Sequence, residues 1–189
     1  MCEAGALGRL IEMAVPPISS ERLDLVSMSP HFISAVLAGR RAEAERLGQL
    51  CVVDNWPDEA DSRFLRLRLE QMQADPSVQV WLARAMVLRD PARTMAGHIG
   101  FHGPPEQVGR AELGYTVFPE FRRRRLATEA VKAMMEWARI KQGVKRFVLA
   151  ISPDNAPSLA MADKLGFTHI GEQIDEIDGL EYLFELIVA

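Results

Sequence analysis

The sequence predicts a single domain of mixed α/β class. Segments with the two-residue period of strands alternate with segments of helical period, and a strong hairpin signal lies near the C-terminus. No low-complexity segment or Gly/Ser-rich linker divides the 189 residues, a length that normally builds one hydrophobic core. We therefore expect one domain over residues 20–189, preceded over residues 1–19 by an N-terminal arm that is either loose or an added strand.

The composition limits the classes of partner. Apolar residues make up 48% and charged residues 25%, as in average globular proteins. The net charge of -4 gives no overall positive field that would draw the protein to nucleic acid or to an anionic membrane. No apolar run reaches transmembrane length, and Arg9 and Glu12 interrupt the apolar stretch of the first twenty residues, which disfavours a secretory signal. We expect a cytoplasmic protein.

Cysteine and histidine give no metal signal. Cys2 and Cys51 are far apart and form no CxxC pair, which disfavours a disulfide scaffold or a zinc site and fits a reducing compartment. The histidines are scattered along the chain. We expect no metal.

The first third of the chain predicts a strand followed by helices. Residues 22–28, "RLDLVSM", alternate as a half-buried strand does. Ser29 and Pro30 then supply a cap and a first-turn proline. Helical patterns follow over residues 32–47 and 58–73.

The middle of the chain predicts an antiparallel meander and then the clearest helix. Residues 78–88, 96–103 and 111–118 indicate three strands separated by turn-rich segments. A helix begins near Leu126 or Ala127 and ends at Gly143.

The last third predicts a strand, a helix and a hairpin. Residues 146–151, "RFVLAI", are typical of a buried strand. The next helix has Asn155 as its cap and Gly166 as its terminator. Two strands then flank Asp178 and Gly179, a dipeptide that favours a tight hairpin turn.

Four consecutive arginines lie in "FPEFRRRRLATEA", residues 118–130, just before the clearest helix. Unpaired backbone N–H groups at a helix N-terminus bind phosphate, and guanidinium groups would add charged donors, so a pyrophosphate site is plausible. The alternatives are a solvated charged face and a patch for nucleic acid.

Two motifs resemble the GNAT family of N-acetyltransferases. The stretch "ELGYTVFPEFRRRRLATEAVKAMMEWA" is similar to the family's acyl-CoA-binding motif Q/R-x-x-G-x-G/A, with Arg122 and Ala127 in its first and last places. The stretch "DNAPSLAMADKLGF" resembles the next motif, and "ERLDLVSMSP" the first strand and turn. Thr128, Glu129 and Ala130 continue as in the branch of ribosomal-protein N-terminal acetyltransferases. The resemblance implies a GNAT-like acyl-CoA N-acyltransferase fold, with a mostly antiparallel twisted sheet flanked by helices and splayed at its fourth and fifth strands.

The chain departs from the motif at its central glycine, which is replaced by Arg125. If the loop needs a left-handed backbone there, a residue other than glycine costs about 1 kcal/mol. The Arg125 side chain would crowd the phosphates, point outward or add a phosphate contact.

The resemblance implies acetyl-CoA as cosubstrate, with no metal. Its pantetheine would pair with the strand at residues 112–118, near a splay at Val117, where a backbone N–H would stabilise the oxyanion. The residues expected to bind acetyl-CoA are Tyr115, Thr116, Val117, Arg122, Arg123, Arg124, Arg125, Leu126, Ala127, Thr128 and Asn155.

The resemblance also suggests catalytic residues. Glu112 is the candidate general base, acting through water, with an exposed strand-end carboxylate as the alternative reading. His102 is a second candidate base. Many family members carry a tyrosine as general acid where this chain has Ala162, so Ser158 is the candidate that hydrogen-bonds the departing sulfur. Tyr182 either packs or acts as an acid.

The expected function is transfer of the acetyl group of acetyl-CoA directly to a primary amine. The acceptor would be the α-amine of a protein or peptide, or a small-molecule amine. We expect no nucleic-acid or membrane partner, and a monomer or homodimer. A non-catalytic CoA-binding or regulatory module is the alternative, motivated by Arg125 and Ala162.

Overall fold

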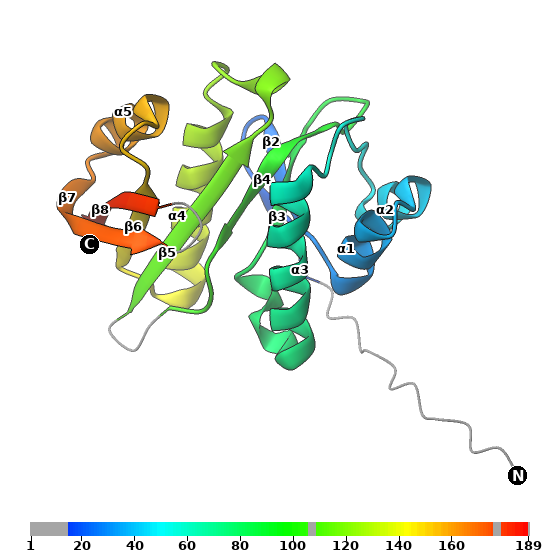
Figure 1. Cartoon of the computed structure of the whole chain (residues 1–189), viewed down its shortest axis with the longest axis horizontal. Helices are drawn as coiled ribbons and strands as arrows, with labels where there is room; N and C mark the ends of the chain where they lie inside the picture. The colour runs from blue at the N-terminus through cyan, green and yellow to red at the C-terminus, as the bar shows by residue number, and fades with distance from the viewer. Residues whose placement is uncertain (1–14, 106–108, 176–178, 189) are drawn as a thin grey trace, which may run out of the picture.

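The computed structural model describes residues 15–105, 109–175 and 179–188. Its strands form a sheet in the order β1-β2-β3-β4-β5-β6-β8-β7 (Figure 1). Neighbours are antiparallel except β5 and β6, which are parallel. The strands are β1 (Ile18–Ser19), β2 (Leu23–Ser27), β3 (Arg84–Leu88), β4 (Met95–Phe101), β5 (Arg110–Val117), β6 (Arg146–Ile151), β7 (Thr168–Asp175) and β8 (Gly179–Ile187).

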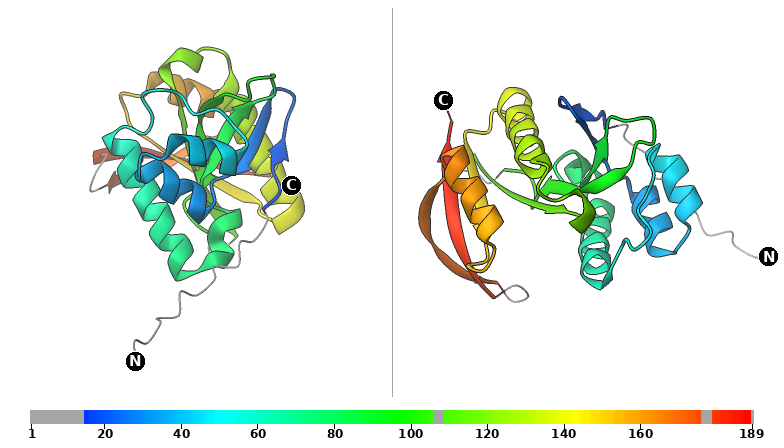
Figure 2. Two further views of the ribbon diagram at one scale, coloured as in Figure 1. Left: turned by 90° about the vertical axis from the view of Figure 1, so that its right-hand side faces the viewer. Right: turned by 90° about the horizontal axis from the view of Figure 1, so that it is seen from above.

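Helices cover both faces of this sheet. One face carries α1 to α3 and the other carries α4, while α5 lies beside β6 (Figures 1 and 2). The helices are α1 (Pro30–Leu37), α2 (Arg41–Gly48), α3 (Glu59–Ala74), α4 (Leu126–Gln142) and α5 (Ala156–Leu165), with 3-10 turns η1 (Pro76–Val80) and η2 (Pro119–Phe121). The mixed α/β class and the mostly antiparallel sheet are confirmed. No described helix combines the length and the apolar character needed to cross a lipid bilayer.

The N-terminal elements follow the sequence signals with one correction. Ser29 caps α1 by accepting a hydrogen bond from the Phe32 amide, as expected. The continuous helical pattern over residues 32–47 is wrong, because the chain leaves α1 at Ala38 and restarts as α2. Gly39 lies between them at φ +70°, a left-handed conformation that ends a helix. Ile18–Ser19 pairs with β2 as an added strand, whereas residues 1–14 of the expected arm lie outside the described residues.

The strand expected over residues 78–88 is shorter than its apolar pattern. Its first residues belong to η1, which begins with Pro76 and is capped by the Asp75 carboxylate. Trp81 then packs edge-on against Phe101, with the ring centroids 5.6 Å apart. The apolar side chains before Arg84 are therefore buried, but they belong to a 3-10 turn and the residues after it rather than to a strand.

The C-terminal half agrees closely with the expected elements. α4 begins at Leu126 and ends at Gly143, which lies at φ +70°, and β6 spans the expected 146–151. α5 has its Asn155 cap and its Gly166 terminator. β7 and β8 form the expected antiparallel hairpin, although Asp178 of its turn lies outside the described residues.

Each face of the sheet has its own apolar core. α4 buries a stripe of side chains at helical spacing against β2 to β6, namely Leu126, Ala130, Val131, Met134 and Ala138. Full burial of a Val or Met side chain contributes about 1.5–3 kcal/mol, so this stripe holds α4 firmly on the sheet. The second core lies under α1, α2 and α3. The rigid α4 fixes the loop that precedes it.

Candidate active site

The sheet opens between β5 and β6. These parallel strands pair at Arg110 with Arg146, Ala111 with Phe147 and Glu112 with Val148, and the pairing stops there. β5 stays paired with β4 as far as Val117, so it follows β4 away from β6. The expected splay is present, but its expected position near Val117 is corrected, because the opening begins directly after Glu112.

The backbone of β5 presents hydrogen-bonding groups to this opening. The His102 amide donates to the Glu112 carbonyl at 2.9 Å, and the Phe118 amide to the Ala96 carbonyl at 3.0 Å. In an antiparallel ladder these bonds identify the even-numbered residues of β5 as the ones bonded to β4. The N–H groups of Tyr115 and Val117 therefore point away from β4, toward the opening.

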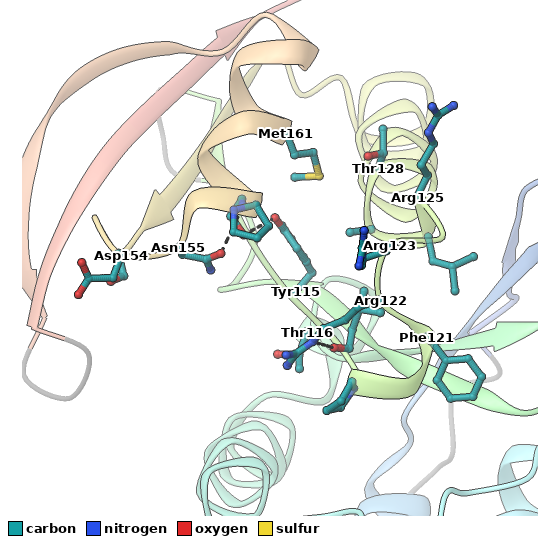
Figure 3. A pocket seen from close by; sticks show the side chains of 17 residues that line it. Tyr115, Thr116, Phe121, Arg122, Arg123, Arg125, Thr128, Asp154, Asn155 and Met161 are labelled. Atoms are coloured by element: carbon teal, nitrogen blue, oxygen red, sulfur yellow. Dashed lines mark hydrogen bonds between the residues drawn. The ribbon is translucent and has the colours of Figure 1, made fainter.

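A cavity of about 1090 Å³ lies at the mouth of this opening (Figure 3). Its walls are the end of β5, the loop between β5 and α4, the first turn of α4 and the first half of α5. All the residues expected to bind acetyl-CoA line it except Arg124, and they are joined there by Ser158. Glu112 does not line it.

The N-terminus of α4 forms one wall of the cavity. The Arg125 side chain makes no capping hydrogen bond to the helix, and the first turn closes with a bond from the Glu129 amide to the Arg125 carbonyl at 3.2 Å. The amides of residues 126–128 precede this bond and have no helical carbonyl to reach. Since these residues line the cavity, the positive end of the α4 dipole favours an anion there.

The arginine loop has an unusual backbone. Arg123 and Arg125 lie at φ +62° and φ +61°, so the expected left-handed conformation at the glycine position is present. Arg122 Nε donates to the Val117 carbonyl at 3.1 Å. The Arg124 guanidinium lies over the Phe121 ring, 5.8 Å from its centroid. The four arginines therefore have different environments, and Arg124 is the one that does not line the cavity.

A half-buried carboxylate ties the loop to the turn between β1 and β2. Glu129 Oε1 accepts hydrogen bonds of 2.7 Å from the Ser20 hydroxyl and the Arg22 amide. The Arg22 guanidinium bonds Glu129 Oε2 and donates to the Arg124 carbonyl at 3.1 Å. Burial acts to raise the pKa of Glu129, but these bonds outweigh it and hold that pKa below 4.5. Glu129 is thus an ionised anchor.

A second contact crosses the opening itself. The Tyr115 hydroxyl donates to Ser158 Oγ at 2.8 Å, linking β5 to the first turn of α5 (Figure 3). Burial raises the pKa of Tyr115 more than the bond to Ser158 lowers it, so the phenol is neutral. The Ser158 amide donates to Asn155 Oδ1 at 3.3 Å, which confirms the cap.

The other catalytic candidates lie outside the cavity wall. Tyr182 pairs with Ile151 and packs against His169, as the packing alternative expected. Glu112 and His102 lie together, with Glu112 Oε1 3.0 Å from His102 Nδ1.

Sequence reasoning missed several lining residues. They are Pro119, Phe121, Ser152, Asp154, Pro157 and Met161. A signal existed for Met161, which follows Ser158 by three residues and so shares its helical face. The two prolines and Phe121 lie within the quoted motifs, but their exposure to the cavity depends on the loop path.

Known proteins resemble this chain in sequence. The profile described as Acetyltransferase (GNAT) domain matches residues 22–168. The N-acetyltransferase 9-like protein of Nematostella vectensis is 40% identical over 81 residues, which are 42% of this chain and 41% of that protein. The chain thus spans less than half the length of this relative.

Solved structures share the fold. An acetyltransferase from Salmonella typhimurium that modifies the N-terminal serine of a 50S ribosomal subunit protein has a TM-score of 0.62 and 18% identity, over 92% of this chain and 99% of that one. The microcin C7 self-immunity acetyltransferase MccE, solved with acetyl-CoA and AMP, has a TM-score of 0.59 and 18% identity, over 89% and 94%. Together with the profile match, the splayed sheet and the loop before α4 lead to one conclusion: the chain belongs to the GNAT family of acetyltransferases.

Proposed function

We propose that this protein is an acetyl-CoA-dependent N-acetyltransferase that acetylates a primary amine. The observation that carries the proposal is the cavity, where the N-terminus of α4 and the arginine loop meet the unpaired edge of β5. Its size and donors fit a long thiol ester with a diphosphate at one end. MccE, which shares the fold, was solved with acetyl-CoA.

The cosubstrate would be held at two places. The amides of residues 126–128 and the Arg123 guanidinium would bind the diphosphate, since charge-assisted donors at a helix N-terminus favour such an anion. The edge of β5 at Tyr115 and Val117 would pair with the amide groups of the pantetheine arm. Five further residues expected to bind acetyl-CoA also line the cavity, namely Arg122, Arg125, Thr116, Thr128 and Asn155. Arg124 was expected there too but does not line it.

The chemistry needs no covalent intermediate, because a bound amine can attack the thioester directly. The Val117 N–H would stabilise the oxyanion. Removing one such donor by mutation in other enzymes costs about 3 kcal/mol. Ser158 would donate a hydrogen bond to the departing sulfur, and Tyr115 would hold the Ser158 hydroxyl in place.

The need for a general base depends on the pKa of the acceptor amine, which must lose a proton before it attacks. A lysine-like amine of pKa about 10.4 is neutral in roughly one of 2500 molecules at pH 7, which costs about 4.6 kcal/mol, whereas an α-amine near 8 costs about 1.4 kcal/mol. Glu112 lies at the start of the opening, and we propose that it provides the base function that this proton removal needs. The protein or peptide α-amine is the favoured acceptor, with a small-molecule amine as the alternative.

A CoA-binding module without catalysis is the second candidate. Two observations favour it: a strained arginine at the motif glycine, and a buried Ala162 where many relatives carry an acid. The two candidates share the cavity and differ in turnover.

Calorimetry with acetyl-CoA, followed by a free-thiol release assay, separates these candidates. The amine panel contains a serine-initiated peptide, a blocked lysine peptide and spermidine. Saturable binding with thiol release supports the enzyme, and binding without release supports the module. No binding at all contradicts both.

The remaining expectations are secondary to this test. We propose a cytoplasmic monomer or homodimer that uses no metal and binds neither nucleic acid nor membrane. The exposed free thiol of Cys51 is compatible with a reducing compartment.

A further inference from the structure

We propose that His102 accepts the proton of the acceptor amine and that Glu112 acts through it, as a positioning residue. This inference rests on the proposed acetyltransfer and names the route by which the proton leaves.

The sheet register brings the two side chains together. The His102 amide donates to the Glu112 carbonyl at 2.9 Å, which continues the β4–β5 ladder by one pair beyond Phe101 and Leu113. Residues directly opposite in such a ladder carry their side chains on the same face. His102 Nδ1 and Glu112 Oε1 accordingly lie 3.0 Å apart.

Gly114 has no side chain and so leaves room for the His102 imidazole. A Cβ on Gly114 would lie 2.9 Å from His102 Nε2, so the ring extends over Gly114, and Nε2 is its nearest atom to that position. Gly114 follows Glu112 on the same face of β5, on the stretch that no longer pairs with β6. Nε2 is therefore directed over the splayed part of the strand, where an amine must approach the thioester.

Charged groups around the pair favour an ionised Glu112. The hydrogen bond with His102 lowers the pKa of Glu112 more than burial raises it, Arg110 lowers it further, and Asp175 acts in the opposite direction. Arg68 of α3, buried at 6% exposure, interacts favourably with Glu112 and donates to the His102 carbonyl at 3.4 Å. A carboxylate facing Nδ1 selects the neutral tautomer that carries its proton on Nδ1.

This tautomer leaves the Nε2 lone pair as the proton acceptor. The ammonium N–H proton moves to Nε2, the amine nitrogen gains its lone pair for attack, and the resulting imidazolium is stabilised by Glu112. The proton later leaves to water. His102 is also the more accessible group, since its side chain is 50% exposed and that of Glu112 25%.

Kinetics with the best amine of the panel test the assignment. His102→Gln should lower kcat about 100-fold or more while leaving the KM for acetyl-CoA within about twofold. The matched control is His169→Gln, on β7 and beside Tyr182, which should keep full activity. Exogenous imidazole should restore part of the rate of His102→Ala, and Gly114→Ala should lower kcat by displacing the ring.

Nitrogen-15 chemical shifts of the imidazole give a readout that does not depend on turnover. In the unaltered protein His102 should carry its proton on Nδ1, and Glu112→Ala should abolish that preference. A proton on Nε2, or a His102→Gln variant with unchanged kcat, overturns the assignment while leaving the acetyltransferase intact. Absence of thiol release by the unaltered protein overturns the proposed function first.

Discussion

The Tyr115 hydroxyl donates to Ser158 Oγ at 2.8 Å across the opening between β5 and β6. In this bond Ser158 Oγ is the acceptor, so the hydrogen of the Ser158 hydroxyl remains available to point into the cavity. The Ser158 hydroxyl is thereby set to meet a sulfur atom that leaves the thioester. Because a thiol has a pKa of about 8.5, a hydrogen bond from serine suffices to stabilise the departing thiolate.

Tyr115→Phe should lower kcat about tenfold and leave the affinity for acetyl-CoA nearly unchanged. Ser158→Ala should have a similar effect, and the double variant should be no slower than either single one, because both act through one hydroxyl. Steady-state thiol release measures this. Additive losses would show that Tyr115 and Ser158 act separately.

The left-handed backbone at residue 125 predicts a stability difference between two small side chains. Arg125→Gly should be about 1 kcal/mol more stable than Arg125→Ala, because only glycine adopts φ +61° without a Cβ penalty. Both variants remove the same charge, so the comparison isolates the backbone. Urea unfolding gives the two free energies. Equal values would mean that the loop relaxes to another conformation.

The Glu129 anchor predicts an acid-dependent loss of stability. Its pKa in the folded protein is below 4.5, so the unfolded chain takes up the proton first as the pH falls. The stabilisation is complete well above pH 4.5 and is lost as the pH falls through the lowered pKa. Glu129→Gln should therefore destabilise the protein by about 1–2 kcal/mol at pH 7, and this difference should shrink below the lowered pKa.

Glu136→Gln is the matched control for this prediction. Glu136 lies on the same helix, is 55% exposed and pairs with the exposed Arg139, so its loss should change little. Urea unfolding of both variants and the unaltered protein, at pH 7 and at a pH below the lowered pKa of Glu129, makes the comparison. A Glu129→Gln variant whose deficit is the same at both would contradict the anchor.

The sequence predicts the start or the end of a helix best where a single capping residue determines it. Such residues act through local backbone geometry. α1 and α5 therefore begin after Ser29 and Asn155, and α4 and α5 end at Gly143 and Gly166, as the sequence indicates. The break at Gly39 was missed because the apolar pattern continues across it. η1 was missed because Trp81 and its neighbours are buried by tertiary contacts that a strand pattern imitates.

The site was only partly predictable for a similar reason. The motif residues before α4 lie within one continuous stretch, so sequence alone could gather them. The Tyr115–Ser158 contact joins residues 43 positions apart, and the His102–Glu112 contact requires the β4–β5 register. Neither follows from periodicity.

The central claim is that the loop before α4 binds the diphosphate of acetyl-CoA. The most direct measurement is calorimetric titration of acetyl-CoA into the unaltered protein, Arg123→Glu and Arg124→Glu. Arg123 lines the cavity and Arg124 lies over Phe121, so the first reversal should weaken binding about tenfold or more and the second distinctly less. Affinity unchanged by Arg123→Glu, or lost equally in both variants, would contradict the assigned site.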